Sequence, residues 1–216
     1  MLKHNEVIVF DGDSLTARRM GPSLNSWPYL RLSNWDRQYP EMVDEWLFCN
    51  RPDLAVTCKV AAIGGSTCKD MLERFDTMVR PHKPSLVIFT VGSNDDAQGV
   101  TTATFSAQLT DYVRRVQDLG GQVLYISGMK ACPNLDAESA RALDARQKFY
   151  QNGMDAVLSL QGQILDIGDI MKTKAEALVK LYPGHTVYSD GLHLNAIGNQ
   201  IIATLVLEKL GVLSLT

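Results

Sequence analysis

Five short runs along the chain are almost entirely apolar, and longer stretches with the spacing of amphipathic helices separate them. The apolar runs cover residues 7–10, 54–63, 86–91, 123–127 and 164–167, and the helical spacing covers residues 40–49, 66–79, 102–119 and 136–160. Runs of this length that are rich in Val, Ile and Leu predict strands buried on both faces, as in a parallel sheet that helices cover.

This alternation of strand and helix predicts an α/β fold, a doubly wound sandwich with about five parallel strands. Right-handed crossovers between parallel strands place helices on both faces of such a sheet. A last helix is expected after Asn195, which is a suitable N-cap, because the apolar residues that follow it fall near one helical face. No linker or internal repeat divides the sequence, so residues 1–216 are expected to form a single domain.

Composition and charge narrow the classes of function. The chain is 45% hydrophobic and 21% charged, which is ordinary for a globular protein, and no apolar run approaches the roughly 20 residues that span a bilayer. With a formal net charge of −3 and scattered basic residues, the chain lacks the basic surface of a nucleic-acid-binding protein. Its start leads directly into an apolar strand, which predicts no secretory leader and a cytoplasmic location. The four cysteines form no Cys-x-x-Cys pair and are expected to be free thiols.

Polar residues follow three of the predicted strands, at the edge of an open parallel sheet where ligands bind. They are residues 11–15 (Asp-Gly-Asp-Ser-Leu), 64–67 (Gly-Gly-Ser-Thr) and 92–96 (Gly-Ser-Asn-Asp-Asp). A fourth polar segment precedes the last helix and holds Asp190 three positions before His193. If the preceding helix descends along the sheet, residues 182–189 can climb back about 26 Å when extended, which brings His193 to the same edge.

These segments contain the groups that nucleophilic catalysis by a serine requires. A serine hydroxyl needs a base within hydrogen-bond reach, and the base needs a third group that fixes its tautomer. Ser14, His193 and Asp190 can fill these roles in that order. A tetrahedral intermediate also needs donors for its oxyanion, and the amides of Ser14 and Gly65 with the side chain of Asn94 can supply them.

The same four segments resemble the sequence blocks of the GDSL family, also called SGNH hydrolases. Residues 12–15 match Gly-Asp-Ser-Leu, Gly65 falls at the glycine of the second block, Asn94 lies in Gly-x-Asn-Asp, and Asp190 with His193 forms Asp-x-x-His. The resemblance covers nearly the whole chain, with the blocks in the family's order. It implies a flavodoxin-like, three-layer α/β/α sandwich with a five-stranded parallel sheet, and hydrolysis of an acyl ester without a metal or an organic cofactor.

Two positions depart from the family pattern. Leu194 stands where many members have proline, and we expect this change to affect only the stiffness of the loop. Asp11 stands where the family more often has an apolar or small residue, and it adds a carboxylate beside the predicted nucleophile. The second departure supports a different interpretation of the same segment.

An apolar strand followed by Asp-x-Asp also resembles the first motif of phosphatases of the haloacid dehalogenase type. Asp11 would then attack phosphorus, Asp13 would be the acid, and Asp95 with Asp96 would hold Mg²⁺. Lys130, shortly after a predicted strand, could supply the lysine that these enzymes need. This interpretation leaves the histidine of the fourth segment without a role.

Other interpretations share the fold but not the reaction. The polar loops could bind a sugar or an acyl ligand without turnover, or the triad could pass the acyl group to an alcohol other than water. The expected substrate is a small-molecule ester, with an acetylated carbohydrate as one candidate, and the oligomeric state stays open. Residues 21–39 hold Trp27, Tyr29, Trp35 and Tyr39, which either wall the substrate site or fill the core beside the next helix.

Overall fold

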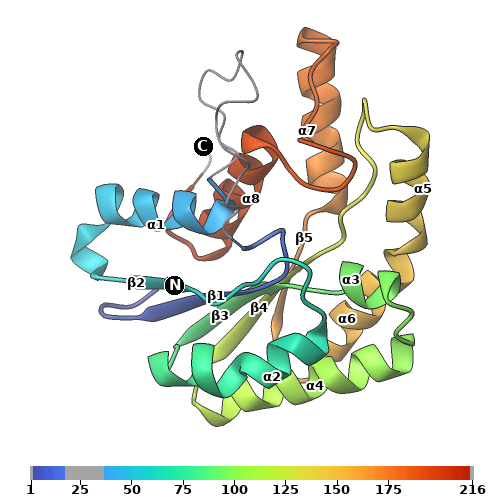
Figure 1. Ribbon diagram of the computed structural model, residues 1–216. Coiled ribbons are helices and arrows are strands. Elements are labelled where there is room, and N and C mark those ends of the chain that lie inside the picture. Colours follow the sequence, from blue (N-terminus) through green and yellow to red (C-terminus); the bar gives the residue numbers. More distant parts are fainter. Residues whose placement is uncertain (1, 18–36, 215–216) are drawn as a thin grey trace, which may run out of the picture.

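The computed structural model describes residues 2–17 and 37–214, which form a five-stranded parallel sheet between two layers of helices (Figure 1). The strands are β1 (Val7–Gly12), β2 (Thr57–Val60), β3 (Leu86–Thr90), β4 (Gln122–Ser127) and β5 (Gln163–Asp166), and their order in the sheet is β2-β1-β3-β4-β5. Every pair of neighbouring strands is parallel. This strand order is that of flavodoxin-like sheets, so the predicted fold class is confirmed.

The helices divide between the two faces of this sheet. They are α1 (Tyr39–Asn50), α2 (Cys68–Met78), α3 (Ser93–Ala97), α4 (Thr102–Asp118), α5 (Ala137–Ala145), α6 (Gln147–Ser159), α7 (Gly168–Leu181) and α8 (Ala196–Lys209), with two single-turn 3-10 helices at Pro52–Leu54 and Arg80–His82. Side chains of α1, α7 and α8 share one buried cluster, and those of α2, α4 and α6 share the other. Figure 1 shows α2, α4 and α6 together below the sheet.

The alternation of side chains along the central strands separates these two clusters. In β1, Ile8 and Phe10 pack in the cluster of α1 and α8, whereas Val9 packs in the cluster of α2 and α4. Every residue of β3 is buried, as predicted for a strand covered on both faces. The prediction was wrong for β2 and β5, whose residues are all exposed or half-buried, because each of these strands lies at an edge of the sheet.

The predicted start of the last helix is confirmed, but one predicted helix is divided into two. Residues 136–160, predicted as one helix, form α5 and α6, which meet at Arg146, where the backbone N–H bonds to the carbonyl three residues back instead of four. Apolar spacing continues through this break and therefore does not reveal it. The last helix, α8, begins as predicted, since the Asn195 side chain accepts from the N–H groups of Ile197 and Gly198 at 2.9 and 3.1 Å.

Two predictions from composition concern membranes and thiols. None of the helices within residues 2–17 and 37–214 is long and apolar enough to cross a membrane. All four cysteines fall within these ranges and are free thiols, as predicted. Cys68 is buried behind the glycine-rich loop, and this burial, with the nearby Asp95 carboxylate, raises the pKa of its thiol well above the usual range. Cys68 is therefore an unreactive structural thiol.

Candidate active site

The predicted nucleophile, Ser14, lies in a turn that begins where β1 ends. Gly12 has a φ of +126°, and a Cβ atom there would lie 2.2 Å from the carbonyl oxygen of Thr90 on β3, so only glycine fits. The buried Asp13 carboxylate then accepts the backbone N–H of Leu15 at 2.9 Å and the Thr90 hydroxyl at 3.1 Å. These bonds fix the turn on both sides of Ser14, which stays half-buried at the carboxyl edge of the sheet.

The segment before α8 returns to this edge, as the sequence suggested. The Nε2 atom of His193 lies 2.9 Å from the Oγ atom of Ser14, although 179 positions separate the two residues. An antiparallel bridge between Tyr188 and Leu194 and a 2.8 Å bond from the Ser189 N–H to the His193 carbonyl fold residues 188–194 into a tight loop. The backbone bonds of this loop therefore fix the position of His193, in addition to the contacts of its imidazole ring.

Asp190 holds the other side of the imidazole. Its Oδ2 atom lies 2.8 Å from His193 Nδ1, and its Oδ1 atom accepts the backbone N–H groups of Leu192 and His193 at 2.8 and 2.6 Å. Partial burial would raise the pKa of this carboxyl, but the hydrogen bonds and the imidazole outweigh burial and lower it to about 2. Because the ionised carboxylate can only accept, Nδ1 carries the imidazole proton and Nε2 presents its lone pair to Ser14.

The predicted oxyanion donors lie on three loops at this edge. Gly65 has a φ of +82°, and no atom lies within 4 Å of the position that a Cβ would take, so the space beside its Cα is open. A Cβ at the neighbouring Gly64 would lie 3.8 Å from the Cβ of Ser14. The Asn94 side chain donates to the carbonyl of Ser66 at 3.0 Å, and its second N–H can donate elsewhere. The structure thus brings the loop of Gly65 against both Ser14 and Asn94.

The arrangement of the acidic residues disfavours the phosphatase interpretation. Asp11 is fully buried, and Arg74 and Tyr112 donate to its two carboxylate oxygens at 2.7 and 2.6 Å. Burial raises the pKa of this carboxyl, while the Arg74 charge and the hydrogen bonds act in the opposite direction. Asp95 accepts the backbone N–H of Cys68. A carboxylate enclosed in this way has no path to a phosphate ester.

The position of Lys130 and the arrangement of possible metal ligands also disfavour the phosphatase interpretation. The Lys130 ammonium forms an exposed ion pair with Asp169 at 2.8 Å. Among the residues that the structure describes, no group of three or more His, Cys, Asp or Glu side chains is arranged to hold a metal ion. Asp95 and Asp96 therefore lack the partners that a Mg²⁺ site would need within this part of the chain.

The aromatic segment before α1 is described only at its end. Trp27, Tyr29 and Trp35 lie outside the described residues, so the two interpretations of their role stay open. Tyr39, the first residue of α1, is fully buried; its hydroxyl lies 3.0 Å from Thr16 Oγ1, and its ring meets Phe10 edge to face at 5.8 Å. Tyr39 therefore belongs to the core and contacts the nucleophile turn through Thr16.

Sequence reasoning missed the buried partners of the loops. Thr90 lies within β3, Arg74 within α2 and Tyr112 within α4, where the sequence shows only ordinary strand or helix spacing. The one available signal was Asp11, since a carboxylate in an apolar strand needs a buried donor or cation. The sequence does not tell which residue supplies it.

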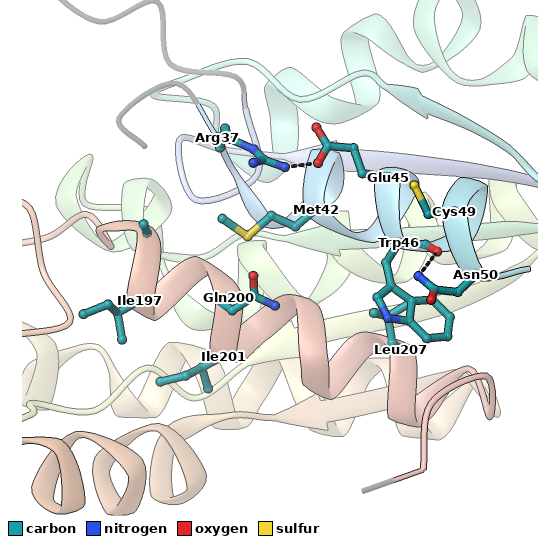
Figure 2. A pocket seen from close by; sticks show the side chains of 11 residues that line it. Arg37, Met42, Glu45, Trp46, Cys49, Asn50, Ile197, Gln200, Ile201 and Leu207 are labelled. Atoms are coloured by element: carbon teal, nitrogen blue, oxygen red, sulfur yellow. Dashed lines mark hydrogen bonds and ion pairs between the residues drawn. The ribbon is translucent and has the colours of Figure 1, made fainter. Parts of the chain in front are cut away.

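One pocket lies away from these loops, whereas another is lined by Gly64, Gly65 and Ser66. Figure 2 shows the first of these pockets between α1 and α8, where Met42 and Trp46 of α1 and Gln200 and Ile201 of α8 are among the side chains that line it. None of the residues that line the pocket between α1 and α8 belongs to the four polar segments that meet at Ser14, although Ala196 directly follows the fourth. The candidate chemistry is therefore assigned to the carboxyl edge of the sheet, at the point between β1 and β3 where the strand order reverses.

Comparison with known proteins agrees with this assignment. The GDSL-like lipase/acylhydrolase family matches residues 10–201. Similar solved structures include a GDSL-like lipase from Parabacteroides merdae (19% identity, TM-score 0.76, 99% of each chain covered) and an acetylxylan esterase from Geobacillus stearothermophilus (20% identity, TM-score 0.75, 97% of this chain and 96% of that chain covered). An α/β hydrolase from the metagenome of Lake Arreo is also similar (19% identity, TM-score 0.73, 99% of this chain and 98% of that chain covered).

At these identities the solved structures establish the fold alone, and no curated protein matches the chain. The family match, by contrast, extends from the last residues of β1 into α8 and includes all four polar segments. The chain therefore belongs to the GDSL-like lipase/acylhydrolase family and is a carboxylic ester hydrolase.

Proposed function

We propose that Ser14, His193 and Asp190 are the catalytic triad of this hydrolase. The observation that carries the proposal is the 2.9 Å distance between Ser14 Oγ and an imidazole whose Nδ1 is held by an ionised carboxylate. His193 takes the hydroxyl proton as Ser14 Oγ attacks the ester carbonyl carbon, then returns it to the leaving alcohol. The acyl group stays on Ser14 until water, activated by the same imidazole, releases it as the acid.

The proposed oxyanion donors are the backbone N–H groups of Ser14 and Gly65 and the second N–H of the Asn94 side chain. Negative charge develops on the carbonyl oxygen when the tetrahedral intermediate forms, and fixed donors stabilise it more than they stabilise the planar ester. The open space beside the Cα of Gly65 lets an ester approach this loop. Asn94 is held toward the same loop by its bond to Ser66. No part of this mechanism calls for a metal or an organic cofactor.

We further propose that the substrate is a small-molecule ester and that acetylated carbohydrates are the class to test first. The fold similarity to an acetylxylan esterase supports this choice, as does the polar character of the loops around Ser14. We also treat residues 1–216 as one catalytic domain, because the three proposed triad residues meet at the edge of a single sheet. The cytoplasmic location expected from the sequence stays a prediction.

The test compares the wild-type enzyme with Ser14→Ala on an aryl acetate, on aryl esters of longer acids and on acetylated xylo-oligosaccharides. We expect turnover on acetyl esters, a fall of at least about 10³-fold on removing the hydroxyl, and a wild-type acyl-enzyme mass on a peptide that contains Ser14. Ser159→Ala, at the end of α6, is the control and should be fully active. Near-normal turnover by Ser14→Ala would refute the triad, and transfer of the acyl group to an added alcohol without release of free acid would refute hydrolysis.

A further inference from the structure

A cluster of buried polar side chains adjoins the loops of the proposed site. It consists of Asp11 at the end of β1, Arg74 on α2 and Tyr112 on α4. Asp11 and Tyr112 are fully buried, and the Arg74 side chain is only 9% exposed. The proposed triad uses none of these residues, and Asp11 is one of the two positions at which this sequence departs from the common family pattern. The role of these buried polar side chains is therefore separate from the chemistry of the triad.

The guanidinium of Arg74 bonds to two loops at once. Its Nη2 atom donates to Asp11 Oδ1 at 2.7 Å and to the Gly12 carbonyl at 2.8 Å, and its Nη1 atom donates to the Ser66 hydroxyl at 2.8 Å. Gly12 is two positions before Ser14, and Ser66 directly follows Gly65. One side chain thus connects residues that lie close in sequence to two of the three proposed oxyanion donors, Ser14 and Gly65.

The third proposed donor is joined to the same cluster through Ser66. The carbonyl of Ser66 accepts the Asn94 side chain at 3.0 Å, while its hydroxyl accepts Arg74. The hydroxyl of Ser66 in turn donates to the Ile63 carbonyl at 2.7 Å, and the Ile63 N–H donates to the Gly12 carbonyl at 3.1 Å. The hydrogen bonds therefore run without interruption from Arg74 to the loops of all three donors.

We propose that Arg74, oriented by Asp11, which Tyr112 in turn holds, is a positioning residue that sets the spacing of the oxyanion hole in this enzyme. The inference rests on the proposed triad and donors. Oxyanion donors are effective only at hydrogen-bond distance from the developing charge, and displacements of about 1 Å can cost about 100-fold in rate. Arg74 fixes that spacing because its planar fork presents several N–H groups at set angles, which a lysine ammonium does not.

Stability alone is a weak explanation for the pair of Asp11 and Arg74. Taking both charges out of water is costly, and apolar replacements of buried ion pairs are often neutral or stabilising. What an apolar pair cannot supply is a set of directed hydrogen bonds to the Gly12 carbonyl and the Ser66 hydroxyl. The double variant Asp11→Leu/Arg74→Met therefore separates a role in stability from a role in positioning the loops. It leaves no unpaired buried charge to destabilise the fold, but it lacks the directed hydrogen bonds.

The experiment measures kcat, KM and melting temperature on an aryl acetate for Arg74→Met, Arg74→Lys and Asp11→Leu/Arg74→Met. For Arg74→Met we expect a kcat about 10- to 100-fold lower with KM within about threefold, because donors that stabilise only the transition state affect kcat. Arg74→Lys should recover part of the melting temperature and little of the kcat. The double variant should melt above Arg74→Met and keep its low kcat. The matched control is Arg80→Met. Arg80 lies in the turn after α2 and forms an exposed ion pair with Asp76, so this variant should keep the wild-type kcat and KM.

A second readout is the affinity for an alkylboronic acid, which forms a tetrahedral adduct with an active serine. Its Kd should rise in step with the loss of kcat/KM in the Arg74 variants. The proposal is overturned if kcat returns together with the melting temperature in the double variant, or if Arg74→Met keeps kcat within twofold. Should Arg74→Met not fold, the double variant and Arg74→Lys decide by the same criteria. Wild-type activity that survives Ser14→Ala would instead overturn the proposed triad.

Discussion

The contact between Asp190 and His193 permits a substitution that reverses the imidazole tautomer without removing the loop. In Asp190→Asn, the remaining carbonyl oxygen can still accept the backbone N–H groups of Leu192 and His193, which now bond to Oδ1 at 2.8 and 2.6 Å. The new amino group would occupy the position of Oδ2, 2.8 Å from Nδ1, and would donate to it. The imidazole proton must then lie on Nε2, where it blocks transfer from Ser14.

The expected loss of kcat is about 10⁴-fold, the size of the effect when a triad carboxylate becomes an amide, and it corresponds to about 5 kcal/mol of activation free energy. The loss of stability should be much smaller. A pKa of about 2 instead of 3.8 corresponds to about 2.5 kcal/mol in a shielded site, but the Asp190 side chain is 44% exposed, so about 1 kcal/mol is expected. Because the folded-state pKa is lowered, this contribution is present above about pH 4 and is lost as the pH falls toward 2.

The assay combines hydrolysis of an aryl acetate with urea unfolding at pH 7 and pH 2.5. Asp190→Asn should have the low kcat at pH 7, and its difference in unfolding free energy from the wild type should shrink at the lower pH. Asp169→Asn, which removes one exposed partner of Lys130, is the control and should match the wild type in both measurements. A kcat within about tenfold of the wild type for Asp190→Asn would refute the tautomer argument and, with it, the role of Asp190.

Three further substitutions test other parts of the site. Asn94→Ala should lower kcat about 100-fold with little change in KM, and a rise in KM with unchanged kcat would contradict its place in the oxyanion hole. Burial raises the pKa of Asp13 to about 6. Because this carboxyl ionises at a lower pH in the unfolded chain, it should lower the wild-type unfolding free energy by about 3 kcal/mol as the pH rises from about 4 to 6. Asp13→Asn should remove this pH dependence, and a variant whose unfolding free energy depends on pH as the wild type's does would contradict it. Gly12→Ala should cost about 3 kcal/mol or more of unfolding free energy, because the added Cβ meets the Thr90 carbonyl at 2.2 Å with a φ of +126°; normal stability would show that β1 and β3 can separate there.

The fold could be predicted because its signals are local. Each central strand is a short apolar run, and each is followed by polar or glycine-rich residues that mark its end. The N-cap Asn195 and the start of α8 follow from the same kind of local chemistry. The exposure of β2 and β5 could not be predicted, because it depends on which strands occupy the edges of the sheet. Strand order is a property of the whole topology, and an apolar run of residues carries no information about its neighbours.

The site divides in the same way between local and distant contacts. The spacing of Asp190 and His193 places a carboxylate beside Nδ1 within one loop, so their pairing follows from the sequence. The pairing of His193 with Ser14 needed the additional premise that residues 182–189 return to the carboxyl edge. The bonds of Asp11 to Arg74 and Tyr112 span 63 and 101 positions, and no pattern in the sequence connects these residues.

The two interpretations of Asp11 and Asp13 differ in one structural fact, which is the direction of each side chain. Side chains alternate along a strand, so Asp11 lies on the same face as Val9, toward α2 and α4, where Arg74 and Tyr112 enclose it. Gly12 interrupts this alternation with its positive φ, and the Asp13 carboxylate consequently turns back to Leu15 and Thr90 instead of lying beside Asp11. An Asp-x-Asp site for phosphate and Mg²⁺ requires both carboxylates to point at one ligand. With glycine between them in this conformation they cannot, and the side chain left facing the open edge is the hydroxyl of Ser14.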